Sequence, residues 1–268
     1  MIRREDGWGH IIQMRHANKS MIRSRRFFDK VSSHFHDLSE KIGSANRITI
    51  SKDIIEPRIG ARVPKDIIEP RIGERVLDIG NGGLKYYNPP QTSYYVGIDF
   101  SLGMLRRGKN RTYDKVCGEA MSLPFKEEKF NTTLYLYLLH HLAQGSIGAT
   151  NEAVKKALRE GATCLKAGGN VIIAETCLPH FLERVERVFF PILRVFLLLT
   201  KQSEVFLFSA ETLTQMLTEC GYREIRTWKF SIKEEHPQKW VRISIGLPLL
   251  KIPRWMNPSR NTIFEARS

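Results

Sequence analysis

Two aspartates and a group of glycines have the types and spacing of a nucleotide-binding site. The segment VLDIGNGG, residues 76–83, ends an apolar run at Asp78 and continues into a glycine-rich turn. A second apolar run, YYVGID, ends at Asp99. Glycine lets a backbone approach a ligand closely, and an acid after the next strand can accept hydrogen bonds from ribose hydroxyls. The pattern predicts strand, tight loop, helix and strand, which is a Rossmann-like unit.

The loop departs from the pattern that binds dinucleotides. Such sites read G-x-G-x-x-G, so that a helix N-terminus meets a pyrophosphate. Here Leu84 stands where another glycine is expected, and Asp78 lies two residues before Gly80. An acid at that point suits a ligand with a cationic end better than it suits a pyrophosphate.

Four motifs, in the order of the chain, resemble those of the class I S-adenosylmethionine (SAM) dependent methyltransferases. After the glycine loop and Asp99, the chain reads CGEAMSLPF over 117–125, LLHHL over 138–142 and LKAGGNVIIAET over 165–176. These segments are similar to the family's GDAxxLPF segment beside the adenine, the turn after its fourth strand, and its LKPGG turn with the fifth strand. The closest branch contains the ubiquinone and menaquinone biosynthesis methyltransferases and many natural-product methyltransferases.

The resemblance implies SAM as the cofactor and gives individual residues a role. It implies that Asp78 orients the methionine ammonium group, Asp99 holds the ribose and Glu119 accepts from the adenine amino group. A purely structural role for Asp78, capping the loop, stays open. The expected cofactor-binding residues are Asp78, Gly80, Asn81, Gly82, Gly83, Asp99, Phe100, Met104, Gly118, Glu119, Ala120 and Tyr137.

The acceptor side offers His140 and His141 as candidate catalytic residues. Both follow the expected fourth strand, and an imidazole with a pKa near ~6.5 could deprotonate a phenol or enol. Either histidine could equally be structural, and Glu175 at the end of the fifth strand is a further candidate. Because the methyl group of SAM is already activated, the protein mainly positions the reactants and excludes water. No metal is expected.

Composition and charge limit the other classes of function. The chain has 268 residues, 42% of them hydrophobic, which suits one α/β domain with additions. Its four scattered cysteines match neither a zinc site nor a disulfide framework, and no secretory signal or bilayer-spanning run is found, so a cytoplasmic location is expected. The net charge of +14 is compatible with nucleic acid, an anionic membrane surface, an acidic substrate or a solvated surface.

Alternating apolar runs predict the fold class, an α/β Rossmann-like sheet of seven mostly parallel strands with helices on both faces. Strands are expected at 75–79, 94–99, 115–118, 132–138 and 170–175, with helices at 101–107 and 151–165. A helix at 209–220 capped by Ser209 should precede two more strands, at 222–232 and 240–247. The family resemblance implies that the last strand is antiparallel and inserted.

The chain is expected to have five parts. They are an N-terminal helical cap (1–46), a linker (47–74), the SAM-binding core (75–179), a helical lid (180–208) and the C-terminal part of the core (209–268). The linker holds the start of a tandem duplication in which 52–64 and 65–77 match at eleven of thirteen positions. The lid could wall an apolar pocket, pack in the core or a homodimer, or touch a membrane.

We therefore predict a SAM-dependent methyltransferase that modifies an oxygen or carbon atom of a small apolar molecule, such as a quinone, polyketide, terpenoid or lipid-like compound. An RNA methyltransferase is an alternative because of the net charge, although no NPPY-type tetrapeptide follows the fourth strand. A SAM-binding protein without transfer activity is the second alternative.

Overall fold

A computed structural model describes most of the chain from residue 65 onward and a short segment before it. The described residues are 22, 24–30, 32, 65–85, 87, 91–108, 113–199, 203–230, 240–242, 251–253 and 257–268. Residues 24–30 are helical, as expected for part of the N-terminal cap. Apart from residues 22 and 32, the rest of that cap lies outside the described residues, as does the first copy of the duplication.

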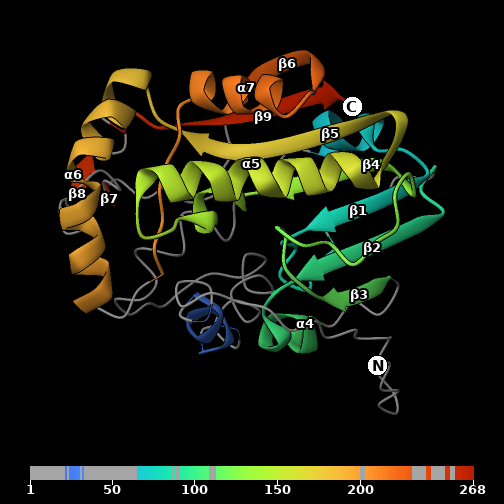
Figure 1. Ribbon diagram of the computed structural model, residues 1–268, viewed down its shortest axis with the longest axis horizontal. Coiled ribbons are helices and arrows are strands. Elements are labelled where there is room, and N and C mark those ends of the chain that lie inside the picture. Colours follow the sequence, from blue (N-terminus) through green and yellow to red (C-terminus); the bar gives the residue numbers. More distant parts are fainter. Residues whose placement is uncertain are drawn as a thin grey trace.

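A seven-stranded sheet with the order β3-β2-β1-β4-β5-β9-β6 forms the centre of the molecule (Figure 1). Its strands are β1 (Arg75–Ile79), β2 (Tyr94–Asp99), β3 (Asp114–Cys117), β4 (Phe130–Leu136), β5 (Leu165–Cys177), β6 (Arg223–Phe230) and β9 (Arg260–Arg267). The first five run parallel, and β9 is antiparallel to both of its neighbours, β5 and β6. The predicted fold class is confirmed.

Three of the described helices begin at a serine cap. From residue 65 onward, the described helices are α3 (Lys65–Ile68), η1 (Glu69–Arg71), α4 (Leu102–Arg107), η2 (Leu139–Leu142), α5 (Ile147–Cys164), α6 (His180–Leu199) and α7 (Ala210–Glu219). Ser101, Ser146 and Ser209 each accept a backbone N–H from the first turn of α4, α5 and α7. Such caps satisfy donors that the helix itself cannot pair, and the expected Ser209 cap is confirmed.

The identity of the last strand differs from the expectation. Residues 240–247 were predicted to be the final strand of the sheet, but β7 (Trp240–Arg242) pairs instead with β8 (Lys251–Pro253) in a separate two-stranded sheet. The inserted antiparallel strand is β9, whose Ile263, Phe264 and Ala266 are buried. The prediction failed because β9 mixes polar with apolar residues and reads less like a buried strand than the apolar segment at 240–247.

The fifth strand also starts earlier than predicted. Its first part contains the glycines of the LKAGG segment, and Gly168 has a φ of +74°. In the pairing with β4, residues 130 and 132 face residues 165 and 170, so the extra residues form a bulge. The expected turn is therefore an irregularity within β5.

Helices cover both faces of the sheet. On one face, Leu77 and Ile79 of β1 belong to a core cluster that includes Val154 and Leu158 of α5. On the other face, Val76 packs with residues of α3 and the segment after it. Figure 1 shows α6 on the side toward which the arrowheads of β1, β2 and β5 point. That is the edge at which open α/β sheets bind ligands.

Candidate active site

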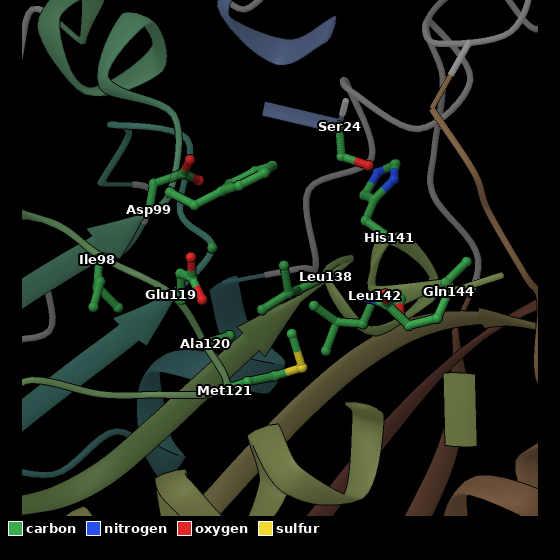
Figure 2. A pocket seen from close by; sticks show the side chains of 14 residues that line it. Ser24, Ile98, Asp99, Glu119, Ala120, Met121, Leu138, His141, Leu142 and Gln144 are labelled. Carbon is green, nitrogen blue, oxygen red and sulfur yellow. The ribbon is translucent and has the colours of Figure 1, made fainter. Parts of the chain in front are cut away.

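A cavity opens at the carboxyl edge of the parallel strands. Its walls come from the ends of β1, β2, β3 and β4, and from the N-terminal helical segment. The lining residues are Ser24, Gly80, Ile98, Asp99, Phe100, Gly118, Glu119, Ala120, Met121, Leu138, His141, Leu142, Ala143 and Gln144. Figure 2 shows Asp99 and Glu119 on one side of this space and His141 on the other.

Half of the expected cofactor residues meet in this cavity. They are Gly80, Asp99, Phe100, Gly118, Glu119 and Ala120, which follow three different strands in the sequence. The other six, Asp78, Asn81, Gly82, Gly83, Met104 and Tyr137, are described by the structure but are not among the lining residues. Asn81, Gly82 and Gly83 complete the loop around Gly80.

The glycine loop has a backbone shape that other residues rarely adopt. Gly80, Gly82 and Gly83 have φ values of +74°, +60° and +77°. A Cβ on Gly80 would stand 2.5 Å from a side-chain carbon of Leu138, and one on Gly83 would stand 2.6 Å from the Met104 carbonyl oxygen. Both the conformation and the close packing therefore require glycine at these positions.

Asp99 links the loops after β1 and β2 while it faces the cavity. One carboxylate oxygen accepts the Gly82 N–H at 2.9 Å, and the other accepts the Ser101 N–H at 2.8 Å. Burial raises the pKa of Asp99 to about 6, although both hydrogen bonds act in the opposite direction. The group is thus charged at neutral pH. Because a carboxylate offers about four acceptor positions, these two bonds leave capacity for ligand hydroxyls.

Asp78 lies beneath the loop. It is 1% exposed, and the Tyr95 hydroxyl donates to its Oδ2 at 2.5 Å. Its Oδ1 has no hydrogen-bond partner in the part of the chain that the structure describes. Burial raises the pKa of Asp78 to about 7. The two acids therefore occupy equivalent strand ends but different environments.

The N-terminal helical segment contacts residues that line or adjoin the cavity. Asp29 accepts hydrogen bonds from the Ser101 hydroxyl at 2.6 Å and the Gly103 N–H at 2.9 Å, both at the start of α4. The Phe28 ring packs edge-on against Phe100 and His141, with centroids 5.8 and 5.0 Å apart. Ser24 of this segment lines the cavity, and a cover formed by the whole segment stays a prediction.

His140 and His141 have different surroundings. Only His141 lines the cavity. His140 is buried, and its Nδ1 lies 2.7 Å from Oε2 of the buried Glu175 in a hydrogen bond. The other Glu175 oxygen accepts the Leu139 N–H at 2.6 Å. Through these two hydrogen bonds, Glu175 fixes the turn that carries His141. The centroids of the two imidazole rings are 4.0 Å apart.

Several cavity residues were not singled out from the sequence. Ile98 and Met121 adjoin predicted positions, Leu142 is the last residue of the LLHHL motif, and Ala143 and Gln144 follow it directly. Ser24 could not be placed because its hydroxyl pairs with that of Ser203, a residue far along the chain, at 3.2 Å. Among the described residues, no cluster of potential metal ligands occurs, and no helix has the length and apolar character needed to cross a bilayer.

Comparison with known proteins agrees with this geometry. Residues 77–173 match the family model described as "Methyltransferase domain". A demethylmenaquinone methyltransferase of Renibacterium salmoninarum is 31% identical over 157 residues, which are 57% of this chain and 61% of that protein. A tRNA (carboxymethyluridine(34)-5-O)-methyltransferase of Arabidopsis thaliana is 29% identical over 98 residues, 37% of this chain and 23% of that protein.

The solved structures show the same fold. A SAM-dependent methyltransferase of Thermotoga maritima superimposes with a TM-score of 0.53 at 14% identity, and the match covers 91% of this chain and 99% of that one. The chain spans less than two thirds of the length of the first curated relatives that it matches, namely 34%, 60% and 61%. Taken with the motifs and the sheet order, the match over 77–173 shows that this chain carries a methyltransferase domain of the class I SAM-dependent family.

Proposed function

We propose that this protein transfers the methyl group of SAM to an oxygen or carbon atom of a small apolar molecule of quinone-like chemistry. The observation that carries the proposal is a single cavity that joins acids suited to SAM with an apolar opposite wall. The menaquinone relatives support the same class of acceptor. SAM supplies a methyl group that is already activated, so the chain itself has to bind, orient and exclude water.

The residues on the β1–β3 side fit this cofactor. Asp99 has acceptor capacity for the two ribose hydroxyls, and Glu119 lines the same space as an acceptor for the adenine amino group. Gly80 leaves room for the backbone to approach the ligand because it has no Cβ. Ala120 is proposed to donate its backbone N–H to the adenine ring.

Asp78 is proposed to act through the loop. Its carboxyl group is held by Tyr95 below Gly80 and is not among the residues that line the cavity. A direct contact with the methionine ammonium group is therefore a less suitable role than support of the loop, or a link through water.

The opposite wall is proposed to hold the acceptor. Leu138 and Leu142 give it an apolar surface, and His141 lines the same cavity on that side in Figure 2. We propose that His141 takes a proton from the acceptor hydroxyl or enol during transfer. Glu175 and His140 act as positioning residues, because they fix the turn without lining the cavity.

The alternatives are separated by following a radiolabelled methyl group. The purified protein would be incubated with labelled SAM and, separately, with the organic-soluble and RNA fractions of its source cells. The proposal predicts label in the organic fraction, and mass spectrometry would then identify the acceptor. Label in RNA would instead favour the second candidate, which the net charge of +14 and the tRNA-modifying relative support. SAM binding without label in either fraction would favour a non-catalytic protein.

Location and assembly remain part of the proposal. The described cysteines are free thiols, which agrees with a reducing, cytoplasmic setting. A homodimer is compatible with the described surface, but the cavity needs no residue from a second copy to contain the proposed groups.

A further inference from the structure

The helix α6 is inverted relative to an ordinary surface helix. Its inward face carries Glu183 and Glu186, which are 0% and 1% exposed, beside buried apolar residues. By contrast, α5 buries Val154 and Leu158 and leaves Glu152 exposed. A helix that contacts only water normally turns its charges outward. The arrangement of α6 therefore indicates that its outer face is covered by something other than water.

Polar contacts hold α6 in this orientation. Glu183 accepts the Ser209 N–H at 2.9 Å and the Thr212 hydroxyl at 2.6 Å, and it forms an ion pair with Arg187. Glu186 accepts the Leu207 N–H at 3.3 Å. These bonds would be lost if the helix rotated to bury its apolar side. The contacts of Glu183 and Glu186 therefore keep the apolar residues of α6 pointing outward.

The outer face of α6 is a continuous apolar stripe. It consists of Phe181, Val185, Val188, Phe189, Ile192, Val195 and Leu199, each a large hydrophobic residue that is exposed. Val188 is 73% exposed and Leu199 is 78% exposed. At 1.5 Å per residue the stripe is about 27 Å long. Contiguous apolar patches of this kind mark interaction sites.

The charge around the stripe favours an anionic partner over a second copy of the chain. Both glutamates of α6 are buried, so the charged side chain exposed on this helix is Arg184. The whole chain carries a net charge of +14. Two copies of such a chain repel each other, whereas an anionic lipid surface attracts each of them. An apolar face bordered by arginine is the pattern of a helix that lies in a membrane interface.

The inner side of α6 contacts a segment that adjoins the cavity. The guanidinium of Arg194 lies on the inner side of α6 beside Gly145, 3.4 Å from where a Cβ on that glycine would stand. Gly145 directly follows Gln144, which lines the cavity. The helix that carries the stripe is therefore packed beside the segment that follows the proposed acceptor wall.

We propose that the outer face of α6 docks the protein onto a lipid bilayer that contains anionic headgroups. The apolar stripe inserts among the lipid chains at the level of the headgroups, and Arg184 contacts the phosphates. The helix lies along the surface and does not span it, in keeping with the absence of a bilayer-spanning helix among the described residues. This inference goes beyond the transfer reaction and does not depend on it.

The test is binding of the full chain to vesicles without SAM or acceptor. Sedimentation with vesicles of phosphatidylcholine and phosphatidylglycerol should show binding that is much weaker on pure phosphatidylcholine. The double substitution Val188→Asp with Ile192→Asp should weaken binding on the order of 100-fold, because two apolar anchors are lost. Arg184→Gln should weaken it about five-fold on the anionic vesicles only.

A matched control carries the same change of charge elsewhere. Ala149→Asp with Thr218→Asp places two aspartates at exposed positions of α5 and α7, and it should bind vesicles nearly as the wild type does. Circular dichroism and SAM titration show that each variant is folded. Failure of the wild type to bind either vesicle, or equal loss in the control, would overturn the proposal. So would a wild-type dimer in light scattering that the α6 substitutions dissociate, combined with no vesicle binding.

Discussion

The two sides of the cavity are built by different means. On the β1–β3 side, the glycine loop, Asp99 and Glu119 lie at or just after strand ends, and the carboxylate of Asp99 accepts backbone N–H groups of two neighbouring loops. On the β4–β5 side, the turn that carries His141 is held by Glu175, 35 residues from His140 in sequence. A backbone hydrogen bond from Phe206 to the His140 carbonyl adds a contact from still farther along the chain.

This difference predicts which kinetic or binding constant a substitution on each side of the cavity should change first. The β1–β3 side depends on local backbone geometry, so substitutions there should change cofactor affinity first. The β4–β5 side depends on buried side-chain contacts, so substitutions there should change turnover first. The predictions below would break this division if the two effects appeared together.

The largest effect is expected from Asp99→Ala. The substitution removes the acceptor proposed for the ribose hydroxyls and also the partner of the Gly82 and Ser101 N–H groups. Hydrogen bonds to a charged group contribute about 1.5–3 kcal/mol each, so SAM affinity should fall at least ~100-fold in calorimetry. Asp114→Ala is the matched control, since Asp114 is an exposed aspartate at the start of β3. Equal affinities of the two variants would contradict the assignment of the cofactor side.

A somewhat smaller effect is expected from Glu175→Ala, and it should appear in kcat and not in the Kd for SAM. The Leu139 N–H and His140 lose a buried partner, so the turn shifts and kcat should fall about 30-fold. The Kd for SAM should stay within about two-fold of the wild-type value. Glu175→Gln keeps an acceptor for Leu139 and should restore part of the turnover. A loss of SAM affinity that matches the loss of kcat would show that the two sides are not separate.

The cofactor side should also respond to pH. Asp99 has a pKa of about 6, so its carboxyl group is mostly protonated at pH 5 and accepts hydrogen bonds less well. SAM affinity should therefore fall about ten-fold between pH 7.5 and pH 5. In Asp99→Asn the affinity should be low and should lack this step. An unchanged step in that variant would assign the titration to another group.

The smallest effect on ligands is expected from Asp78→Asn, with SAM affinity changing less than about three-fold. Its effect is on stability. The carboxyl group of Asp78 has a pKa of about 7 in the folded protein, against the ordinary value of 3.8 for an unfolded chain. Between these two pH values the unfolded chain therefore holds fewer protons than the folded protein. Stability contributed by the protonated form is therefore lost as the pH rises from about 4 to 7.

Thermal unfolding between pH 4 and pH 8 measures this effect. Asp78→Asn should become more stable than the wild type as the pH rises, by on the order of 3 kcal/mol at pH 8. A difference between the two proteins that does not change with pH would show that Asp78 has an ordinary pKa. A large loss of SAM affinity in Asp78→Asn would instead indicate that Asp78 contacts the cofactor directly, as the motif implies.

The sequence predicted the local features of this molecule well. The bounds of β1 and β2 and the Ser209 cap follow from apolar runs and capping residues, which need no knowledge of distant contacts. The position of Asp78 below the loop could not be predicted, because it depends on which face of β1 meets Tyr95. The identity of β9 as the inserted strand depends on pairing with β5 and β6, and no local pattern marks it. The inward glutamates of α6 likewise have partners far along the chain.

Amide hydrogen exchange with and without SAM tests the central claim most directly, because it shows which loops around the cavity the cofactor contacts. SAM should slow exchange in peptides that cover residues 79–84, 98–104 and 117–122, where the loops after β1, β2 and β3 line or adjoin the cavity. Peptides from the outer part of α6 should be unchanged. Protection confined to other parts of the chain, with none at these three loops, would contradict the account.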